Sequence, residues 1–178
     1  EISRSDDPTI EQTYVDVVAR VGAAQEADGY ISTAFGKAGQ PARWSDLEWG
    51  HELYCLGHLM QAAVARLRTR PTAEDGLVTI ACRAADLVCA TFDSAGLGGV
   101  CGHPEVELGL VELGRATGRP EYVQQAQLFI ERRGHGRLDD IQWGREYFLD
   151  DIPVREATVL RGHAVRARRS RGSRPAWT

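Results

Sequence analysis

Every histidine in the 178-residue sequence follows a glycine, which makes the imidazoles the first candidates for chemistry. The five pairs are Gly50-His51, Gly57-His58, Gly102-His103, Gly134-His135 and Gly162-His163. Because glycine has no Cβ, a backbone segment or a ligand can approach closely beside the imidazole. His51 and His103 are expected at the N-terminal ends of two helices, where unpaired N–H groups and the helix dipole favour acceptor oxygens. This setting suits a hydroxylated ligand; the alternative for each histidine is a buried ring bonded to a carbonyl.

A zinc site is a second interpretation of the same region. His51, Cys55 and His58 recur at i, i+4 and i+7, so one helix face carries two imidazoles and a thiol, which are groups that zinc prefers. No fourth ligand is identified, although Cys101 and His103 are candidates for a distant one. The same spacing fits the apolar stripe of that helix, and known zinc motifs have tighter, paired spacings. The sequence therefore assigns no metal ligand.

The acidic residues near these histidines are less informative. Glu105 and Glu107 lie two residues apart, so on a helix they point in different directions and cannot act as one acid pair. Glu105 suits the first turn of a helix, and Glu107 is the better candidate for an inward-facing acid. Glu156 follows Arg155, and pairing with that arginine is favoured over contact with a ligand.

Aromatic residues gather in or beside the segments expected to be loops. They are Tyr30, Trp44, Trp49, Tyr54, Trp143 and Tyr147. Such rings stack on sugars, and they also cover the end of a hydrophobic core, so both interpretations stay open.

Helical periodicity runs through most of the chain and predicts an all-α protein of six helices. Capping residues or prolines mark their starts, and glycines or prolines mark most of their ends. The expected helices run from Pro8 to Asp28, from Ser45 to near Pro71, from Thr72 through Val88, from Pro104 to Gly118, from Pro120 to Gly134, and from Pro153 through Ala164.

The connections between these helices alternate between short and long. Short links join the second helix to the third and the fourth to the fifth, which predicts two antiparallel hairpins. The long links cover residues 28–48, 93–103 and 134–152, and each leads into an even-numbered helix. They should therefore meet at one end of the helices, where we place the site. A recurrence of about 50 residues is typical of helical hairpins in solenoids or closed α/α toroids.

Composition excludes several protein classes. Hydrophobic residues make up 43% and charged residues 26%, which is typical of a globular protein. No apolar run reaches the roughly 18 residues that a membrane span needs, so we expect a soluble protein, with a cytoplasmic location slightly favoured and the compartment unknown. The formal charge is −4, although residues 166–174 contain five arginines and no acid. The acidic remainder offers nucleic acid no basic face.

Several short motifs follow one another along the chain. They are Asp28-Gly29-Tyr30, Arg43-Trp44, His51-Glu52-Leu53-Tyr54-Cys55 with Gly57-His58-Leu59, Gly102-His103-Pro104-Glu105, Pro153-Val154-Arg155-Glu156 and Gly162-His163-Ala164-Val165-Arg166-Ala167. Together they resemble the β-L-arabinofuranosidases of glycoside hydrolase family 127, over residues 9–167. The resemblance implies part of an (α/α) barrel of six helical hairpins. It also implies that His51, His103 and His163 contact the arabinofuranose of a glycan or small glycoside.

The same resemblance shows which family motifs are unmatched. Enzymes of that family are retaining glycosidases that use a cysteine nucleophile in a zinc–cysteine cluster and a glutamate acid/base, and these motifs have no counterpart here. No catalytic or zinc-binding role is therefore transferred to the four cysteines, which are Cys55, Cys82, Cys89 and Cys101. Two positions also depart from the family pattern, since Asp151 replaces a usual histidine and Ala157 a usual glutamine.

The family pattern breaks after Ala167. We therefore expect a partial barrel domain over residues 1–167 and a basic, disordered tail over residues 168–178. The chain is interpreted as a truncated or frame-shifted glycosidase, with helix faces open to self-association and enzymatic activity undecided. The alternatives are a non-catalytic carbohydrate-binding remnant, and a sugar epimerase or isomerase of α/α-barrel type with His51 or His103 as acid/base.

Overall fold

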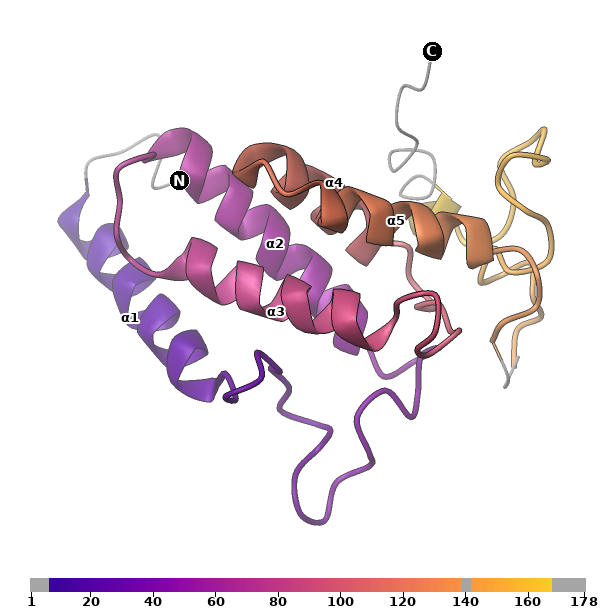
Figure 1. The fold of residues 1–178 in the computed structure, drawn as a ribbon, viewed down its shortest axis with the longest axis horizontal. Helices are drawn as coiled ribbons and strands as arrows, with labels where there is room; N and C mark the ends of the chain where they lie inside the picture. Colours follow the sequence, from indigo (N-terminus) through magenta and orange to yellow (C-terminus); the bar gives the residue numbers. More distant parts are fainter. Residues whose placement is uncertain (1–6, 139–141, 168–178) are drawn as a thin grey trace.

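The computed structural model describes residues 7–138 and 142–167, and in this part of the chain all regular structure is helical. The helices are α1 (Pro8–Ala24), α2 (Glu52–Thr69), α3 (Leu77–Thr91), α4 (Val106–Thr117) and α5 (Pro120–Arg132) (Figure 1). A last helical turn begins at Ala164. None of the described helices is long and apolar enough to cross a membrane. The predicted tail at 168–178 lies outside the described residues.

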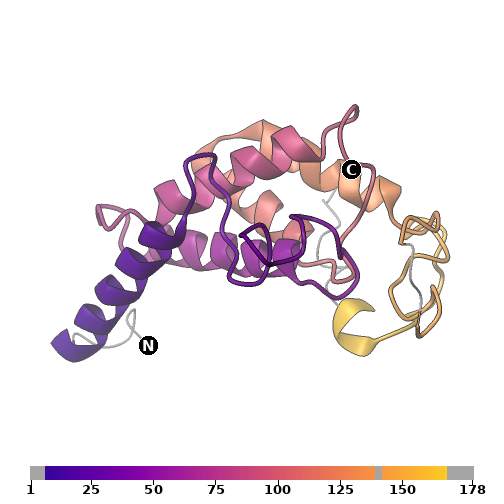
Figure 2. The ribbon, with the colours of Figure 1, turned by 90° about the horizontal axis from the view of Figure 1, so that it is seen from below.

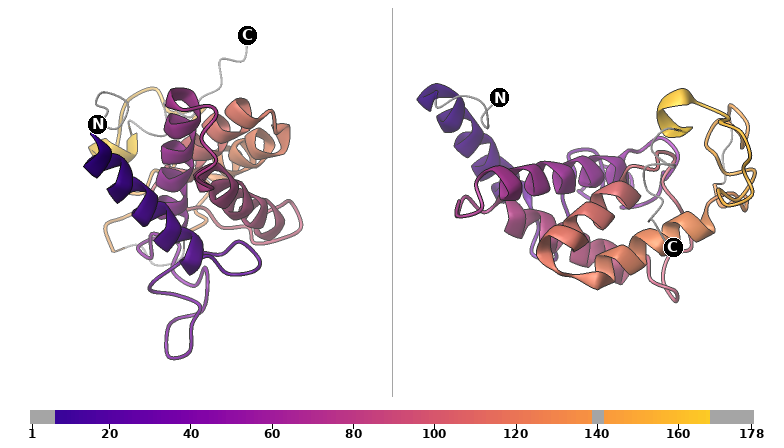
Figure 3. Two further views of the ribbon diagram at one scale, coloured as in Figure 1. Left: turned by 90° about the vertical axis from the view of Figure 1, so that its left-hand side faces the viewer. Right: turned by 90° about the horizontal axis from the view of Figure 1, so that it is seen from above.

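The helices form two packed layers. α2 pairs with α3 and α4 pairs with α5, which confirms the two predicted hairpins. α2 and α4 pack against each other in one layer, while α3 contacts α1 and α5 in the other. Residues 134–138 and 142–167 lie at one end of the helices (Figure 2), and α1 lies at the opposite end (Figure 3, right).

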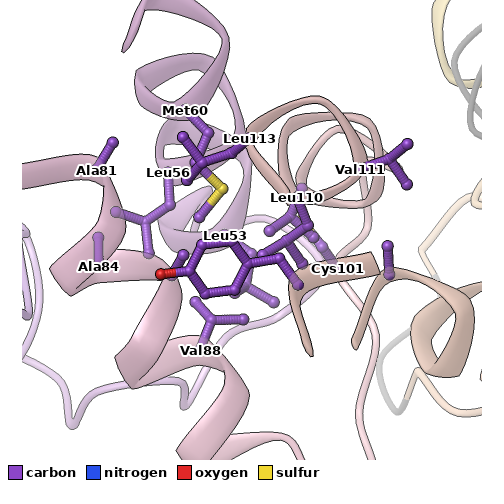
Figure 4. Close-up of a cluster of buried hydrophobic side chains, with 14 of the residues drawn as sticks. Leu53, Leu56, Met60, Ala81, Ala84, Val88, Cys101, Leu110, Val111 and Leu113 are labelled. Atoms are coloured by element: carbon purple, nitrogen blue, oxygen red, sulfur yellow. The ribbon is translucent and has the colours of Figure 1, made fainter. Parts of the chain in front are cut away.

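The hydrophobic core lies where α2, α3 and α4 meet (Figure 4). It includes Leu53, Leu56 and Met60 of α2, Ala81, Ala84 and Val88 of α3, and Leu110, Val111 and Leu113 of α4. Burial of each large apolar side chain contributes about 1.5–3 kcal/mol, so these stripes hold the layers together. In α1, helical spacing places Ile10, Tyr14, Val17, Val18 and Val21 on one apolar face, and Val17 departs from this expectation because it is 52% exposed.

Two glycines meet where α2 packs on α4. A Cβ added to Gly57 would lie 2.7 Å from the carbonyl oxygen of Glu105, and a Cβ added to Gly109 would lie 2.6 Å from the carbonyl oxygen of Gly57. Side-chain carbons do not approach backbone atoms this closely, so a larger residue at either position would push the helices apart. The two glycines therefore set the separation of α2 and α4.

Two of the predicted helix starts are wrong. Residues 45–50 form turns and α2 begins at Glu52, because Asp46 accepts hydrogen bonds from Gly50 N through its backbone carbonyl (3.1 Å) and from Trp49 N through its carboxylate (2.8 Å). The third helix begins at Leu77, whose N–H donates to Asp75 Oδ1 at 3.2 Å. In both segments local side-chain bonds replace the first helical turn.

The predicted sixth helix, Pro153 through Ala164, is also wrong. Residues 154–156 form a single turn, and the helical turn at Ala164 begins eleven positions after Pro153. Val159 and Leu160 are 62% and 60% exposed, so this segment does not bury a continuous apolar face. Gly162 is left-handed, with φ of +64°, which separates the segment from the turn that follows it.

We predict that Gly57→Ala lowers the free energy of unfolding by about 1–3 kcal/mol, because the added methyl overpacks the α2–α4 contact. Urea denaturation of the 178-residue chain measures the effect. Gly98→Ala is the matched control, since the nearest atom to an added Cβ lies 4.0 Å away. Equal stability of the two variants would contradict the tight crossing.

Candidate functional site

Two of the three histidines predicted to bind a ligand, His51 and His103, come together where α2 and α4 begin. The imidazole centroids of His51 and His103 are 5.0 Å apart, and the Tyr54 ring lies 4.8 Å from that of His103. His163 packs against Tyr147, with ring centroids 5.2 Å apart. Since His163 immediately precedes the helical turn at Ala164, all three histidines lie at or near the start of a helical segment.

His51 occupies a strained backbone position. It is the residue before the first turn of α2, with φ of 59° in the left-handed region, and its side chain does not cap the helix. The Nδ1 atom instead bonds to the carbonyl oxygen of Trp49. A left-handed non-glycine residue costs roughly 1–3 kcal/mol and persists only where its surroundings hold it, which is common at functional sites.

Close backbone packing explains the repeated Gly-His pairs. At each of the five glycines, an added Cβ would overlap the backbone of another segment. The overlapped residue is Asp46 for Gly50, Glu105 for Gly57, Glu48 for Gly102, Ile152 for Gly134 and Glu146 for Gly162. Each glycine thus admits another backbone segment beside a histidine, which was one of the two roles expected from the sequence. The pairs anchor the long loops against the helix ends.

A buried arginine completes the histidine cluster. Arg166 is 1% exposed, and its Nη2 donates a hydrogen bond to His103 Nε2 at 2.9 Å. Its guanidinium carbon lies 4.3 Å from the ring centroid of Tyr147, 4.6 Å from that of Phe148 and 5.5 Å from that of Trp49. From the sequence, Arg166 was placed inside the barrel domain but was given no role in the site. Its spacing could have indicated its place in the site, because Arg166 lies three residues after His163, about one helical turn away.

The cluster keeps His103 neutral. Burial lowers the pKa of His103 to about 3, and the positive charges of Arg166, of Arg133 and of protonated His51 or His163 act in the same direction. His103 Nδ1 and His163 Nδ1 are buried and have no hydrogen-bond partner among the described residues. These nitrogens can therefore bond to a neutral ligand that brings its own hydroxyl groups.

A second buried arginine ties two long loops to α4. Arg133 donates hydrogen bonds to the carbonyl oxygen of Cys101 at 2.7 Å, to that of Phe148 at 3.2 Å and to Glu107 Oε1 at 2.8 Å. The side chains of Arg133 and Glu107 are 3% and 1% exposed. Glu107 thus points inward as predicted, where it forms an internal ion pair. Sequence reasoning missed Arg133.

The loop between α1 and α2 is held by another buried carboxylate. Glu52 accepts hydrogen bonds from the hydroxyl of Tyr30 and from Trp44 N, the latter at 2.9 Å. Burial raises the pKa of Glu52. Tyr30 and Trp44 also pack edge to face, and Trp44 contacts the buried Phe92. These two aromatic residues therefore cover the core.

The other predicted aromatic residues surround the cluster. Tyr54 packs among His51, His58 and His103, whereas Trp49 and Tyr147 enclose Arg166. Trp143 stacks on Tyr147 and is 63% exposed, which leaves it the most accessible of these rings for stacking on a sugar.

The Pro153 motif contributes ion pairs. Arg155 lies 3.8 Å from Glu131, while Glu156 is exposed, so the predicted pairing of Arg155 with Glu156 is wrong. Asp151, at the position of the family histidine, accepts from Arg161 at 2.7 Å. The described residues thus use this segment for surface pairing.

The described residues do not fit the zinc that the family resemblance implies. In this part of the chain, no group of three or more His, Cys, Asp or Glu side chains could hold a metal ion. Cys55 is exposed, and His58 Nδ1 lies 3.5 Å from Glu105. Burial raises the pKa of the Cys55 thiol, and raises those of Cys89 and Cys101 to about 12. In this environment the three thiols are held protonated, and no neighbouring positive group lowers their pKa enough to favour the thiolate.

Comparison with known proteins identifies the family. Residues 2–178 match the family described as β-L-arabinofuranosidase, GH127 catalytic domain. The chain belongs to this glycoside hydrolase family. The resemblance expected from the motifs is therefore confirmed, and the match continues past Ala167. Because residues 168–178 lie outside the described part, the domain boundary at 167 stays a prediction.

Individual GH127 proteins are similar over part of their length. The non-reducing end β-L-arabinofuranosidase of Bifidobacterium longum is 32% identical over 174 residues, which cover 85% of this chain and 26% of that protein. The crystal structure of a GH127 β-L-arabinofuranosidase from Geobacillus stearothermophilus matches with a TM-score of 0.84 and 36% identity, over 92% of this chain and 28% of that one. Another GH127 β-arabinofuranosidase structure matches with a TM-score of 0.77 and 33% identity, over 90% of this chain and 26% of that one.

The chain thus spans about a quarter of the length of the relatives it matches. Its described helices form part of the α/α barrel of these enzymes, which confirms the predicted fold class.

We predict that Arg133→Met lowers the free energy of unfolding by about 3–5 kcal/mol, because Glu107 would become an unpaired buried charge. Urea denaturation measures the loss. Arg68→Met is the control, since Arg68 is 62% exposed and lies 3.7 Å from Glu112 in a surface pair worth about 0–1 kcal/mol. Equal losses in the two variants would refute the tie between the loops and α4.

We predict a pH effect for His103. Its folded pKa lies below the ordinary value of about 6.5, so the unfolded chain binds the proton more readily. The wild-type chain should therefore lose stability through this group as pH falls from about 6.5 toward about 3, and His103→Gln should lose less. Urea denaturation at several pH values tests this, and parallel pH profiles would contradict it.

Proposed function

We propose that this chain forms part of a site that binds a terminal β-L-arabinofuranoside, with His51, His103 and His163 contacting the sugar hydroxyls. The observation that carries the proposal is the contact between the imidazoles of His51 and His103 at the starts of neighbouring helices, with His163 connected to them through Tyr147 and Arg166, in a chain of the GH127 family. The relatives named as β-L-arabinofuranosidases support this choice of sugar. The ligand would be an arabinose-containing glycan or a small glycoside.

Neutral, partly buried imidazoles suit a polyhydroxylated ligand. The unpartnered Nδ1 atoms of His103 and His163 would leave buried polar groups unsatisfied, at a cost of about 1–3 kcal/mol each, unless a ligand or water bonds to them. A furanose hydroxyl can both donate and accept, so it matches such nitrogens without bringing a charge. Trp143 is placed to stack on a sugar ring beyond Tyr147.

Hydrolysis of terminal β-L-arabinofuranosides is proposed as the activity of the whole protein. No catalytic residue is assigned within the described part of the chain, because the family motifs that carry the cysteine nucleophile and the glutamate acid/base have no counterpart in this sequence. Zinc, if the whole protein uses it as the family resemblance implies, would need other ligands. Carbohydrate binding without turnover is therefore the activity expected of these residues.

An epimerase or isomerase is the less suitable alternative. Such an enzyme needs a histidine that gains and loses a proton near neutral pH. The pKa of about 3 makes His103 a poor candidate, and the family match favours a glycosidase. Self-association through exposed apolar residues such as Val159, Leu160 and Val165 stays a prediction.

We predict that methyl β-L-arabinofuranoside binds the 178-residue chain and that His51→Ala, His103→Ala and His163→Ala each weaken binding by about tenfold, or roughly 1.4 kcal/mol. Titration calorimetry measures the affinities. His135→Ala is the control, because His135 also follows a glycine but is exposed and outside the cluster. Failure of the sugar to bind the wild-type chain, or an equal loss in the control, would refute the proposal.

A further inference from the structure

Arg166 fixes the position of a proton on its neighbour. Its Nη2 lies 2.9 Å from His103 Nε2. Because a guanidinium has only N–H donors, Nε2 must be the acceptor in this hydrogen bond. A neutral imidazole that accepts at Nε2 carries its proton on Nδ1, and Nδ1 is the buried nitrogen of His103 that has no partner among the described residues.

We propose that Arg166 is a positioning residue that holds His103 in the Nδ1–H tautomer, so that His103 offers a hydrogen-bond donor to an acceptor oxygen of the ligand. Nothing in the family comparison assigns a role to this arginine. The identity of the oxygen, a furanose hydroxyl, rests on the proposed function; the tautomer does not.

His51 offers a hydrogen-bond acceptor, whereas His103 offers a donor. Its Nδ1 bonds to the carbonyl oxygen of Trp49, and since a carbonyl only accepts, the proton of His51 also lies on Nδ1. The remaining nitrogen of neutral His51, Nε2, is then an acceptor. The neighbouring imidazoles of His51 and His103 therefore provide one acceptor and one donor, which match a hydroxyl in both of its roles.

The surroundings of Arg166 distinguish it from a structural ion pair. Arg66 and Arg133, also buried, each pair with a carboxylate, respectively Asp75 and Glu107. Arg166 has no such partner among the described residues, and its Nε and Nη1 atoms are buried without hydrogen bonds there. Contact with the rings of Trp49, Tyr147 and Phe148 keeps the cation in place. Its polar contacts are therefore with uncharged groups, namely the hydrogen bond to His103 and an interaction with the Tyr147 hydroxyl.

The charges around His103 favour its neutral form. Burial is the largest cause, and the permanent charges of Arg166 and Arg133 also disfavour a second positive charge, as His51 and His163 do when they are protonated. Arg166 itself stays protonated, because a guanidinium keeps its proton in proteins even when burial lowers its pKa. The donor and acceptor in this pair are thus fixed by the chemistry of the two groups.

The test is nitrogen NMR of the chain with ¹⁵N-labelled histidine at neutral pH, with His103→Gln used to assign the His103 signals. The wild-type chain should show a protonated Nδ1 and an unprotonated Nε2. Arg166→Met removes the donor and should shift His103 toward the Nε2–H tautomer, while Arg166→Lys, which keeps a donor, should restore part of the wild-type population. Arg161→Met, which removes an ion pair with Asp151, is the matched control and should leave the tautomer unchanged.

The wild-type spectrum alone can overturn the proposal, so it does not depend on the folding of a variant. A protonated Nε2 on His103 in the wild-type chain would do so, and so would an unchanged tautomer in folded Arg166→Met. Binding of methyl β-L-arabinofuranoside to the same samples should weaken about threefold to tenfold in Arg166→Met, as expected for one neutral hydrogen bond. If the tautomer is as proposed and the sugar does not bind, the inference about Arg166 stands and the proposed function fails.

Discussion

The close packing of α2 on α4 determines where the site can form. Gly57 and Gly109 let the two backbones meet without an intervening side chain, so the starts of both helices lie at the same end of the molecule. His51 precedes α2 and His103 lies just before α4, and their rings are therefore neighbours. A single methyl group at the crossing would act on the spacing of these rings as well as on stability. Structure and binding thus depend on the same contact.

Buried polar groups connect the long loops to this helix pair. Arg133 joins two loops through backbone carbonyls and pairs with Glu107 on α4, whereas Glu52 on α2 holds the loop that carries Tyr30. These groups are costly to bury unless all their partners are in place, so each loop has one favoured position. Arg166 differs, because rings and an imidazole surround it where a carboxylate would be usual. The loops are held by an ion pair and by hydrogen bonds to buried groups, and the imidazoles lie at the ligand end of the helices.

The sequence correctly predicted the helices whose apolar faces are buried in the core. The stripe of Leu53, Leu56 and Met60 is buried, and the two hairpins follow from the short links. It failed where tertiary contacts override local signals, as at Ser45, where turns replace the expected helix start, and after Pro153, where a single turn replaces the expected helix and Leu160 is exposed. Among the site residues, the three histidines were predicted from the sequence, through expected helix starts and family motifs. Arg166 was missed because an arginine-rich run has the composition of a solvated tail, and only the fold shows that its first member is buried.

The juxtaposition of His51 and His103 is tested most directly by proton NMR of the 178-residue chain. Nuclear Overhauser contacts between ring protons report distances of a few ångströms, and the rings of His51, Tyr54 and His103 are predicted to show them, since their centroids lie 5.0 Å and 4.8 Å apart across the two helix starts. A folded chain with well-dispersed signals and no contact between the rings of His51 and His103 would contradict the arrangement, and with it the site built on the α2–α4 crossing.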